Sequence, residues 1–413
     1  MLKSLSRRLV SLAAAASFAA LPLAGPLLTV HASSGGTLFG ITGFGQSVLS
    51  TIDPSTGVVT DIENLAGAEQ GQLTSVTGDP IAHRVYAVRE AQIFVPPSTI
   101  LVHDQLLTIN SDNGSFTASA IGAVGPGQIV FDSSTGLLYQ LNFGGRLSSI
   151  DPIRGKTTPV ATLAVSPGDI LGMTVVPGAN TIYVGQSIFS FDTFTFNHAV
   201  ITVNTQTGAT STSPVTPGRL GFLLDDPSAG LLLTSDNQNL YSLDPSSGVE
   251  TLISNFNINP QALFFFAGAI DPSTNTVYLH LNIFDFFNPP PVDQIVTIND
   301  VTGSFATSTG NLTTSQLESL YFQPQVIVTP DSIAADVRNA LASGHITKAG
   351  IADTLLSDLN AAKAARDRGQ CKTAANIYQG FINDVAAQSG KAITTTTASL
   401  LTREALNLQG SCP

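Results

Sequence analysis

The sequence has little charge, little sulfur and no tryptophan. Only 11% of its 413 residues are charged, and the formal net charge is -12. Nucleic-acid-binding proteins need clustered Lys and Arg, so this composition argues against that class. The chain contains no Trp and is rich in Thr, Ser, Gly and Pro. That balance is typical of a protein whose surface consists of strands and turns.

The motifs of the common enzyme classes are absent as well. No G-x-S-x-G, H-E-x-x-H, Walker A or C-x-x-C motif occurs, and no G-x-G-x-x-G motif follows a predicted strand. Such motifs place a nucleophile, a metal or a phosphate where the chemistry needs it. Their absence argues against an enzyme, and we leave catalysis open.

The first 32 residues have the pattern of a secretory signal peptide. Basic residues precede an apolar run over residues 9–28, and Val30-His31-Ala32 resembles a small-residue cleavage site. An uncleaved membrane anchor is the alternative, although Gly25 and Pro26 interrupt the run. We expect cleavage after Ala32, and no later segment is apolar enough to span a membrane. The protein should then be secreted, periplasmic or on the cell surface.

One short pattern recurs along the chain: Asp or Asn, three residues, then Gly. Asp or Asn can hydrogen-bond the backbone of a turn, and Gly accepts the positive φ that the turn needs. A hydrophobic strand precedes each copy and a Thr/Ser-rich strand follows, so each copy is predicted to be a hairpin tip. The six copies are Asp53 to Gly57, Asn110 to Gly114, Asp151 to Gly155, Asn204 to Gly208, Asp244 to Gly248 and Asn299 to Gly303.

The repeats predict a mainly β fold, a six-bladed β-propeller over residues 33–326. Each unit contains four antiparallel strands, which is the content of one blade. One blade is split: its first strand lies at 316–322 and its other three at 37–41, 48–52 and 58–62. Sharing a blade between the two ends closes the ring and removes exposed edges. An open sandwich of similar strands is the alternative.

Long and short units alternate, because three units carry an insert between their second and third strands. Successive turns are 57, 41, 53, 40 and 55 residues apart. The inserts, Ala91–Asp104, Gln186–His198 and Asn282–Asp293, are predicted to be loops on the face where the blades are connected. They are apolar, and one interpretation is that they form a binding rim; the alternative is that their aromatics fold back onto the protein. The rim residues are Phe94, Phe194, Phe196, Phe286 and Phe287.

A polar residue begins or precedes each first strand. First strands line the central channel of a propeller, so these residues are predicted to ring its mouth and to bind a polar ligand. The alternative is that they are polar only because a channel mouth is wet. The six are Gln72, Gln128, Asp169, Arg219, Gln261 and Gln316.

Metal binding is the weaker possibility, and we expect no cofactor. Histidines near the inserts could converge as metal ligands, and acidic residues there could supply oxygen ligands to Ca²⁺, although no EF-hand loop is present. These are His103, His198 and His280, with Asp104, Asp192, Asp285 and Asp293. Asp225-Asp226 is predicted to belong to a turn before Pro227 and not to a paired-carboxylate site.

The repeat units resemble the YVTN/quinoprotein-type β-propellers. The residues that carry the resemblance are turns such as Ile52-Asp-Pro-Ser-Thr-Gly57 and second strands with Leu-Tyr or Val-Tyr, over residues 36–324. The resemblance implies the architecture and is nearly silent on activity, because such propellers include enzymes, lectins and protein-binding scaffolds.

Residues 327–413 are predicted to form a four-helix domain. Thr329-Pro330-Asp331-Ser332 is a helix start, and apolar residues at helical spacing follow in four segments divided by Gly344, Gly369 and Gly390. In an exported chain the cysteine pair, Cys371 and Cys412, implies a disulfide. It would close a loop of about 42 residues and add about 4 kcal/mol of stability. Free thiols with a redox role are the alternative.

This segment resembles the FIMAH domain, a helical module of exported bacterial proteins, often hydrolases. The matching residues include Ala342-Ser-Gly-His-Ile346, Leu355-Leu-Ser-Asp-Leu-Asn-Ala-Ala362 and Asp367-Arg-Gly-Gln-Cys371. Tyr378-Gln379-Gly380 departs from the expected Leu-rich pattern, which puts local packing in doubt. The family implies no catalytic residues.

Together these features predict an exported binding protein that presents one loop face to a protein or glycan at the cell envelope or outside the cell. The alternative is a secreted hydrolase or lyase with a metal-assisted site at the channel mouth. A structural component of a surface layer or stalk is a third possibility.

Overall fold

The structure is a computed structural model of the 413-residue chain. It describes residues 32–42, 47–65, 71–95, 99–121, 125, 127–165, 170–190, 193, 195–236, 238–256, 264–283, 292–312 and 317–410. The predicted signal peptide lies outside these residues except for Ala32, so its cleavage stays a prediction.

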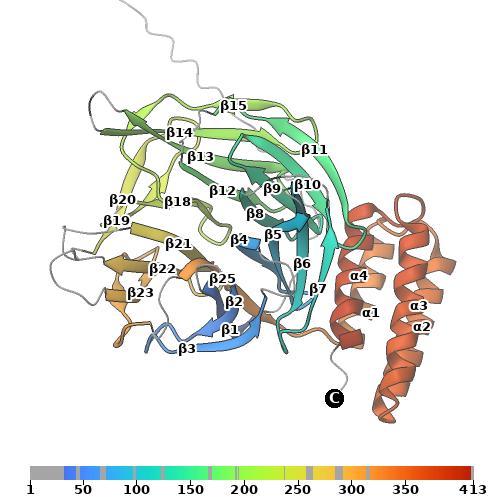
Figure 1. The fold of residues 1–413 in the computed structure, drawn as a ribbon. Coiled ribbons are helices and arrows are strands. Elements are labelled where there is room, and N and C mark those ends of the chain that lie inside the picture. Colours follow the sequence, from blue (N-terminus) through green and yellow to red (C-terminus); the bar gives the residue numbers. More distant parts are fainter. Residues whose placement is uncertain are drawn as a thin grey trace, which may run out of the picture. The chain divides into compact units, whose positions relative to one another are not determined.

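The strands form six antiparallel sheets arranged around a common centre, which confirms the six-bladed β-propeller (Figure 1). Blade 1 contains β25 (Leu317–Val326), β1 (Ala32–Thr42), β2 (Val48–Ile52) and β3 (Val59–Asn64). Blade 2 contains β4 (Gly71–Asp79), β5 (Arg84–Val95), β6 (Thr99–Asn110) and β7 (Phe116–Ala120). Blade 3 contains β8 (Gly127–Asp132), β9 (Leu137–Asn142), β10 (Arg146–Asp151) and β11 (Lys156–Thr162).

The other three blades follow the same order of strands. Blade 4 contains β12 (Ile170–Val176), β13 (Thr181–Ser190), β14 (Thr195–Asn204) and β15 (Thr210–Thr212), with β16 (Thr216–Pro217) also paired to β14. Blade 5 contains β17 (Leu224–Asp226), β18 (Leu231–Ser235), β19 (Asn239–Leu243) and β20 (Glu250–Asn255). Blade 6 contains β21 (Phe264–Asp271), β22 (Thr276–Ile283), β23 (Val292–Asn299) and β24 (Phe305–Thr307).

Blade 1 joins the two ends of the propeller, as the sequence predicts. Strand β25 pairs antiparallel with β1, with Leu38 opposite Phe322 and Gly40 opposite Leu320. The pairing fixes the last strand to the first and leaves the closed ring without a free inner edge.

The Asp/Asn-x-x-x-Gly segments are hairpin tips between third and fourth strands. In the first, Gly57 donates its backbone N–H to the Asp53 carbonyl at 2.8 Å and has a φ of 79°. The Ser55 hydroxyl and amide hydrogen-bond the Asp53 carboxylate and lower its pKa to about 2. A Cβ on Gly57 would lie 2.6 Å from the Gly310 carbonyl of the preceding segment. Glycine is therefore needed both for the turn and for close packing on the neighbouring blade.

A second set of Asx turns joins first to second strands, and the turn predicted at Asp226 is one of them. Gly136 donates its N–H to the Asp132 carbonyl at 2.8 Å, as in the hairpin tips. The aspartates that start these turns are buried: Asp79, Asp132, Asp226 and Asp271. Together with the hairpin tips, these turns form one end of the propeller, here called the turn face. The second–third-strand turns and the connections between blades form the opposite end, here called the loop face.

The sequence analysis predicted that the inserts are loops, and the structure corrects this. They lengthen the second and third strands into long hairpins: β5 pairs with β6 from Arg84–Asn110 out to Val95–Thr99, and β13 with β14 out to Ser190–Thr195. Equal numbers of residues added to both strands preserve the pairing register, so the backbone hydrogen bonds continue outward.

Apolar side chains fill the spaces between neighbouring blades. One cluster packs Phe39 and Leu49 of blade 1 against Val85 and Leu107 of blade 2, and similar clusters lie between each later pair. Each interface has its own core because every sheet is apolar on both sides. The propeller is thus stabilised blade against blade.

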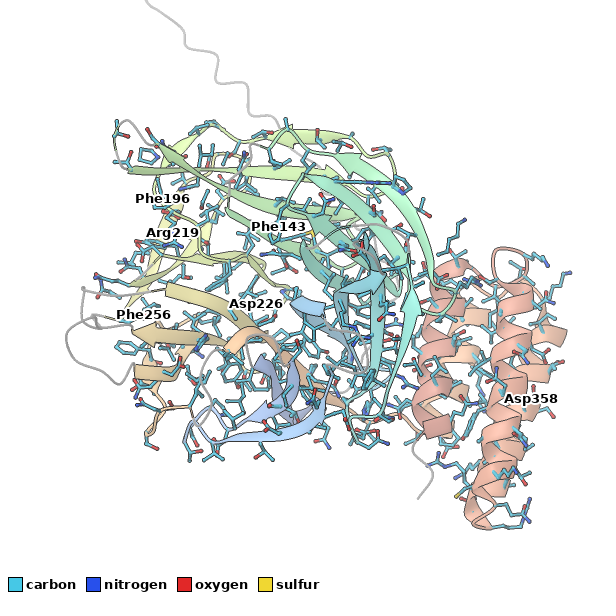
Figure 2. The ribbon with its side chains drawn as sticks, in the orientation of Figure 1. Phe143, Phe196, Arg219, Asp226, Phe256 and Asp358 are labelled. Carbon is cyan, nitrogen blue, oxygen red and sulfur yellow. The ribbon has the colours of Figure 1, made fainter. Side chains whose placement is uncertain are left out.

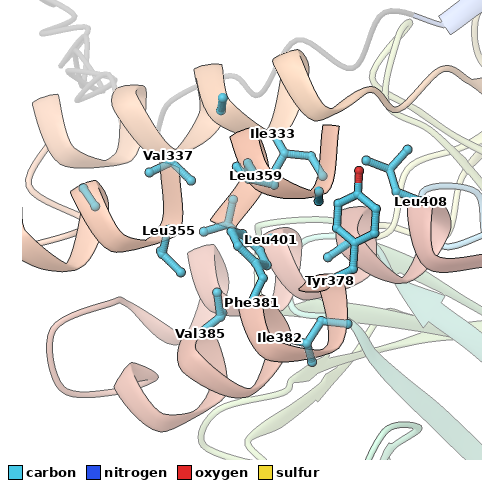
Figure 3. Packing of buried hydrophobic residues seen from close by; sticks show 14 of the residues in the cluster. Ile333, Val337, Leu355, Leu359, Tyr378, Phe381, Ile382, Val385, Leu401 and Leu408 are labelled. Carbon is cyan, nitrogen blue, oxygen red and sulfur yellow. The ribbon is translucent and has the colours of Figure 1, made fainter. Parts of the chain in front are cut away.

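Four helices follow the propeller: α1 (Pro330–Ala342), α2 (Ala349–Asp367), α3 (Cys371–Gln388) and α4 (Thr395–Gly410). Thr329 caps α1 in a capping box with Ser332, as Thr-Pro-Asp-Ser predicts. The core shown in Figure 3 includes Tyr378, which is fully buried. The departure from a Leu-rich pattern at this position is therefore accommodated by the packing.

Helix α4 also contacts the turn face of the propeller. The Arg403 guanidinium lies 3.2 Å from the Asp79 carboxylate and donates to the Ser133 carbonyl at 2.6 Å. The Asn407 amide donates to the Ile81 carbonyl at 2.7 Å. First–second-strand turns of blades 2 and 3 are therefore in contact with the chain's own helical domain.

Candidate functional site

A pocket of about 400 Å³ lies between blades 4 and 5 on the loop face. It is built from the start of β14, the connection between the blades, and the turn between β18 and β19. Its lining residues are Thr195, Phe196, Gly218, Arg219, Asp236, Gln238 and Asn239. Pockets of this size hold small ligands of one or two rings.

Arg219 and Phe196 form the wall between the two blades. The guanidinium carbon of Arg219 lies 5.2 Å from the centre of the Phe196 ring, which is a cation–π contact (Figure 2). Both side chains are half-buried, and burial lowers the pKa of Arg219. The sequence analysis assigned these residues to two separate features, the polar ring and the apolar rim. The structure brings them together.

Asp236 holds the opposite wall in place. Its carboxylate accepts hydrogen bonds from the backbone N–H groups of Gln238 and Asn239, both at 2.7 Å, and from the Tyr241 hydroxyl at 2.8 Å. The Asn239 side-chain amide donates to the same carboxylate at 3.0 and 2.9 Å. Asp236 therefore fixes the β18–β19 turn, and sequence reasoning missed it. The unbroken polar run Ser235-Asp-Asn-Gln-Asn239 was the available signal.

Gly218 separates the pocket from His198, which is buried, and from Glu250, which is half-buried. A Cβ on Gly218 would lie 3.3 Å from His198 Nδ1 and 3.5 Å from Glu250 Oε2. His198 is fully buried and its Nε2 lies 3.0 Å from the Gly248 carbonyl, while its Nδ1 has no hydrogen-bond partner among the described residues. Burial raises the pKa of Glu250, which His198 partly offsets. The carboxyl group of Glu250, behind Gly218, therefore keeps a proton to a higher pH than an ordinary glutamate does.

The structure describes only part of the predicted polar ring. Gln128 is half-buried in β8, and Gln72 lies in β4 with only its backbone described. Asp169, Gln261 and Gln316 lie outside the described residues. That the six residues share one channel mouth stays a prediction.

The predicted apolar rim is also only partly described. Phe94 lies in β5, with its side chain outside the described part, and Phe194, Phe286 and Phe287 lie outside it altogether. Phe143, in the β9–β10 turn of the loop face, was not predicted and is 59% exposed. Its position between Asn142 and Gly144 in a turn could have identified it.

Of the histidines and aspartates considered as metal ligands, His280 and Asp293 contact each other, and His198 makes a different contact. His198 hydrogen-bonds the backbone of blade 5, whereas His280 contacts Asp293 within blade 6 at 2.5 Å. Among the described residues no group of three His, Cys, Asp or Glu side chains could hold a metal ion. Asp192 and Asp285 lie outside these residues, so binding of Ca²⁺ is untested.

Asp226 lies in a turn, as predicted, yet it is also close to a second carboxyl group. Its carboxylate accepts from the Ser228 amide at 2.9 Å. Burial, followed by the nearby Asp226 carboxyl, raises the pKa of Asp300 to about 7. Burial also raises the pKa of Asp225 to about 6. Sequence reasoning missed this contact because Asp300 comes from the next blade.

Comparison with known proteins identifies the C-terminal helices. Residues 330–410 match the family described as the FIMAH domain. The helical segment of this protein is a FIMAH domain appended to a β-propeller. No curated protein matches the sequence.

Two solved structures are similar to the chain at low sequence identity. The β-propeller domain of Myceliophteria thermophila Cps50 (Swd1) aligns with a TM-score of 0.43 at 10% identity, covering 69% of this chain and 87% of that one. An oligogalacturonate lyase in complex with manganese aligns with a TM-score of 0.38 at 8% identity, covering 67% and 74%.

Two further expectations concern the membrane and the cysteines. None of the helices in the described part of the chain has the length and hydropathy to cross a bilayer. Cys371 opens α3 as predicted, but Cys412 lies outside the described residues. The disulfide between them stays a prediction.

Proposed function

We propose that the protein is an exported binding protein that presents the loop face of its propeller to a glycan or protein ligand. The observation that carries this proposal is the pocket between blades 4 and 5. It combines a cation, an aromatic ring and amide groups, which is the mixture found in ligand-binding clefts.

The attachment of the helical domain supports the choice of face. Arg403 and Asn407 of α4 contact turns of blades 2 and 3 on the turn face. The pocket lies on the opposite face, where the described residues include no contact with the helices. A ligand on the loop face would therefore not compete with these helix contacts.

The test is binding of the purified chain to arrayed glycans and to soluble proteins from a bacterial envelope. Phe196→Ala and Arg219→Ala should each weaken binding of a captured ligand at least about tenfold, since truncating a central aromatic or arginine anchor costs 2 kcal/mol or more. Matched controls are Phe305→Ala and Arg154→Ala, which alter an exposed phenylalanine and an exposed arginine elsewhere on the propeller.

The controls should bind like the unmodified chain. If every ligand binds the pocket variants and the unmodified chain equally, the pocket is not the site and the proposal fails. Thermal unfolding of each variant shows whether a loss of binding is a loss of folding.

A further inference from the structure

We propose that two carboxyl groups on the turn face, those of Asp226 and Asp300, hold a Ca²⁺ ion between blades 5 and 6. Asp226, labelled in Figure 2, ends β17 and starts the turn to β18. Asp300 directly follows β23 in the hairpin tip of blade 6. The pocket lies on the opposite face, so this site is independent of the proposed ligand-binding function.

Both carboxyl groups are buried, and most of their oxygen atoms have no donor. Asp226 is fully buried and Asp300 is 2% exposed. Asp226 Oδ2 and both carboxyl oxygens of Asp300 have no hydrogen-bond partner among the described residues. The described Arg, Lys and His side chains form no ion pair with either group. A buried carboxylate is costly unless it is paired or coordinates a metal, so these three oxygens favour a bound cation.

Hydrogen bonds between the two blades bring the oxygen atoms together. The Asp300 N–H donates to the Asn275 carbonyl at 3.0 Å. The Ser228 hydroxyl lies 2.6 Å from Asn275 Oδ1 and 2.7 Å from Asp226 Oδ1, and its single proton can serve only one of them. Burial, followed by the nearby Asp226 carboxyl, raises the pKa of Asp300 to about 7. A divalent cation between the two carboxyl groups would replace this repulsion by attraction.

The chemistry of these side chains suits Ca²⁺. Asp226 and Asp300 offer carboxylate oxygens, Asn275 an amide oxygen and Ser228 a hydroxyl. Ca²⁺ takes about six to eight oxygen ligands from carboxylates, amide carbonyls and water in a flexible geometry. The set contains no sulfur or imidazole ligand, which zinc and copper prefer. Two carboxylates also match the double charge of the ion.

The corresponding aspartates of other blades have a hydroxyl partner that Asp226 lacks. In blade 3 the Thr135 hydroxyl donates to Asp132 Oδ2 at 2.8 Å, and Thr274 does the same for the aspartate of blade 6. In blade 5 this position of the turn is Ala229, which has no hydroxyl. Asp226 Oδ2 is therefore left to another ligand.

Blade 2 shows a cation at the corresponding place. Its aspartate, Asp79, lies 3.2 Å from the guanidinium of Arg403. The residues that correspond to Asp300 in blades 2 and 4 are Ser111 and Thr205, whose N–H groups bond the first–second-strand turn in the same way. Both are uncharged. Between blades 5 and 6, two carboxyl groups meet and no described cationic side chain pairs with them.

The experiment measures the binding of Ca²⁺ alone to the full chain after treatment with EDTA. Isothermal titration gives the dissociation constant, and thermal unfolding is followed with and without CaCl₂. At about 100 times the dissociation constant, Ca²⁺ should raise the melting temperature by at least about 3 °C, because it binds only the folded chain. MgCl₂ should give a smaller rise, since Mg²⁺ loses its water reluctantly and demands a stricter geometry.

Variants locate the ion. Asp226→Asn and Asp300→Asn should each weaken Ca²⁺ binding at least about tenfold, because the number of charged ligands sets the affinity. The matched control Asp132→Asn alters the corresponding aspartate of blade 3 and should bind Ca²⁺ like the unmodified chain. Ala229→Thr keeps both carboxylates but gives Asp226 Oδ2 a hydroxyl donor, as Thr135 does in blade 3. It should also weaken Ca²⁺ binding.

Two results would overturn the site. The first is the absence of binding heat and of any change in melting temperature up to about 10 mM CaCl₂, which exceeds the dissociation constants of weak extracellular sites. The two carboxyl groups would then share a proton instead. The second is undiminished Ca²⁺ binding in both asparagine variants, which would place the ion elsewhere in the chain. A response to Mg²⁺ equal to that to Ca²⁺ would overturn the choice of ion.

Unfolding of each variant in EDTA shows that a loss of binding is not a loss of folding, since asparagine keeps the shape of aspartate. None of these results bears on the loop-face function, whose test is the loss of ligand binding in Phe196→Ala and Arg219→Ala.

Discussion

Two arginines of this protein each lie over a phenylalanine ring, and their surroundings differ. Arg219 is 5.2 Å from the centre of the Phe196 ring and lines an open pocket. Arg403 is 5.5 Å from the centre of the Phe131 ring, is 4% exposed, and bonds Asp79 and Ser133. An arginine over a phenylalanine ring thus occurs both at the edge of a pocket and in a buried contact between α4 and the propeller.

The difference shows that the burial of a charged side chain decides whether its loss mainly affects stability or ligand binding. At Arg403 the carboxylate partner comes from the protein and is itself fully buried, so the charges are already matched. Arg219, by contrast, is half-buried and lines a pocket on the loop face. Removing Arg403 should therefore harm stability most, and removing Arg219 should harm ligand binding most.

The largest expected effect is the loss of stability when Arg403 is replaced. Arg403→Met should lower the free energy of unfolding by about 3–5 kcal/mol, because Asp79 would stay buried without its charged partner. Urea unfolding followed by circular dichroism measures this loss. Arg219→Met should lose far less, as should the exposed control Arg154→Met, whose side chain is 63% exposed.

A second variant keeps this prediction interpretable. Adding Asp79→Asn to Arg403→Met removes the unpaired charge and should restore part of the lost stability. Equal stability of Arg403→Met and the unmodified chain would show that the ion pair does not hold α4 on the propeller.

The repeats were predictable because their cause is local. An Asp or Asn that bonds its own turn and a Gly at positive φ act within five residues, as the six tips from Asp53 to Gly303 show. The four helices followed from apolar spacing and from glycines such as Gly344 in the same way. Lengthened hairpins were mistaken for loops because the strand pairing that continues them depends on both strands at once.

The candidate site was predictable only in parts. Phe196 and Arg219 were identified from their positions in the repeats, but their contact joins blade 4 to the connection after it. Arg403 and Asp79 are 324 residues apart, and no local pattern relates them. Contacts between blades depend on the packing of whole sheets, which the sequence of one blade does not contain.

A glycine pair tests whether the helical domain is seated on the turn face. Gly136 and Gly230 end equivalent first–second-strand turns with φ values of 72° and 66°. A Cβ on Gly136 would lie 2.2 Å from the Ser399 hydroxyl of α4, whereas one on Gly230 would meet nothing within 4 Å. Gly230→Ala should cost roughly 1–2 kcal/mol from the left-handed backbone alone. Gly136→Ala should cost that amount plus the cost of displacing Ser399.

The comparison of the two alanine variants isolates the contact with α4. Both are measured by thermal unfolding, and limited proteolysis between Val326 and Pro330 shows whether the helices have separated from the propeller. Equal losses in the two variants would mean that α4 does not press on the Gly136 turn in solution.

The smallest effect concerns carboxyl groups that retain a proton in the folded state. Burial, followed by the nearby Asp336 carboxyl, raises the pKa of Glu404, which adjoins Arg403 in α4. The unfolded chain releases this proton above its ordinary pKa of 4.5, so stability should fall as the pH rises from there. Asp300, with a pKa of about 7, should contribute a similar fall between pH 4 and 7. The melting temperature should therefore be lower at pH 8 than at pH 5.

Glu404→Gln and Asp300→Asn should each make that difference smaller, while Glu250→Gln at the half-buried pocket wall should change it less. If Glu404→Gln shows the same difference in melting temperature between pH 5 and pH 8 as the unmodified chain, Glu404 does not lose its proton within that pH range. The surroundings of Arg403 and of Arg219 would then not differ in how they respond to pH.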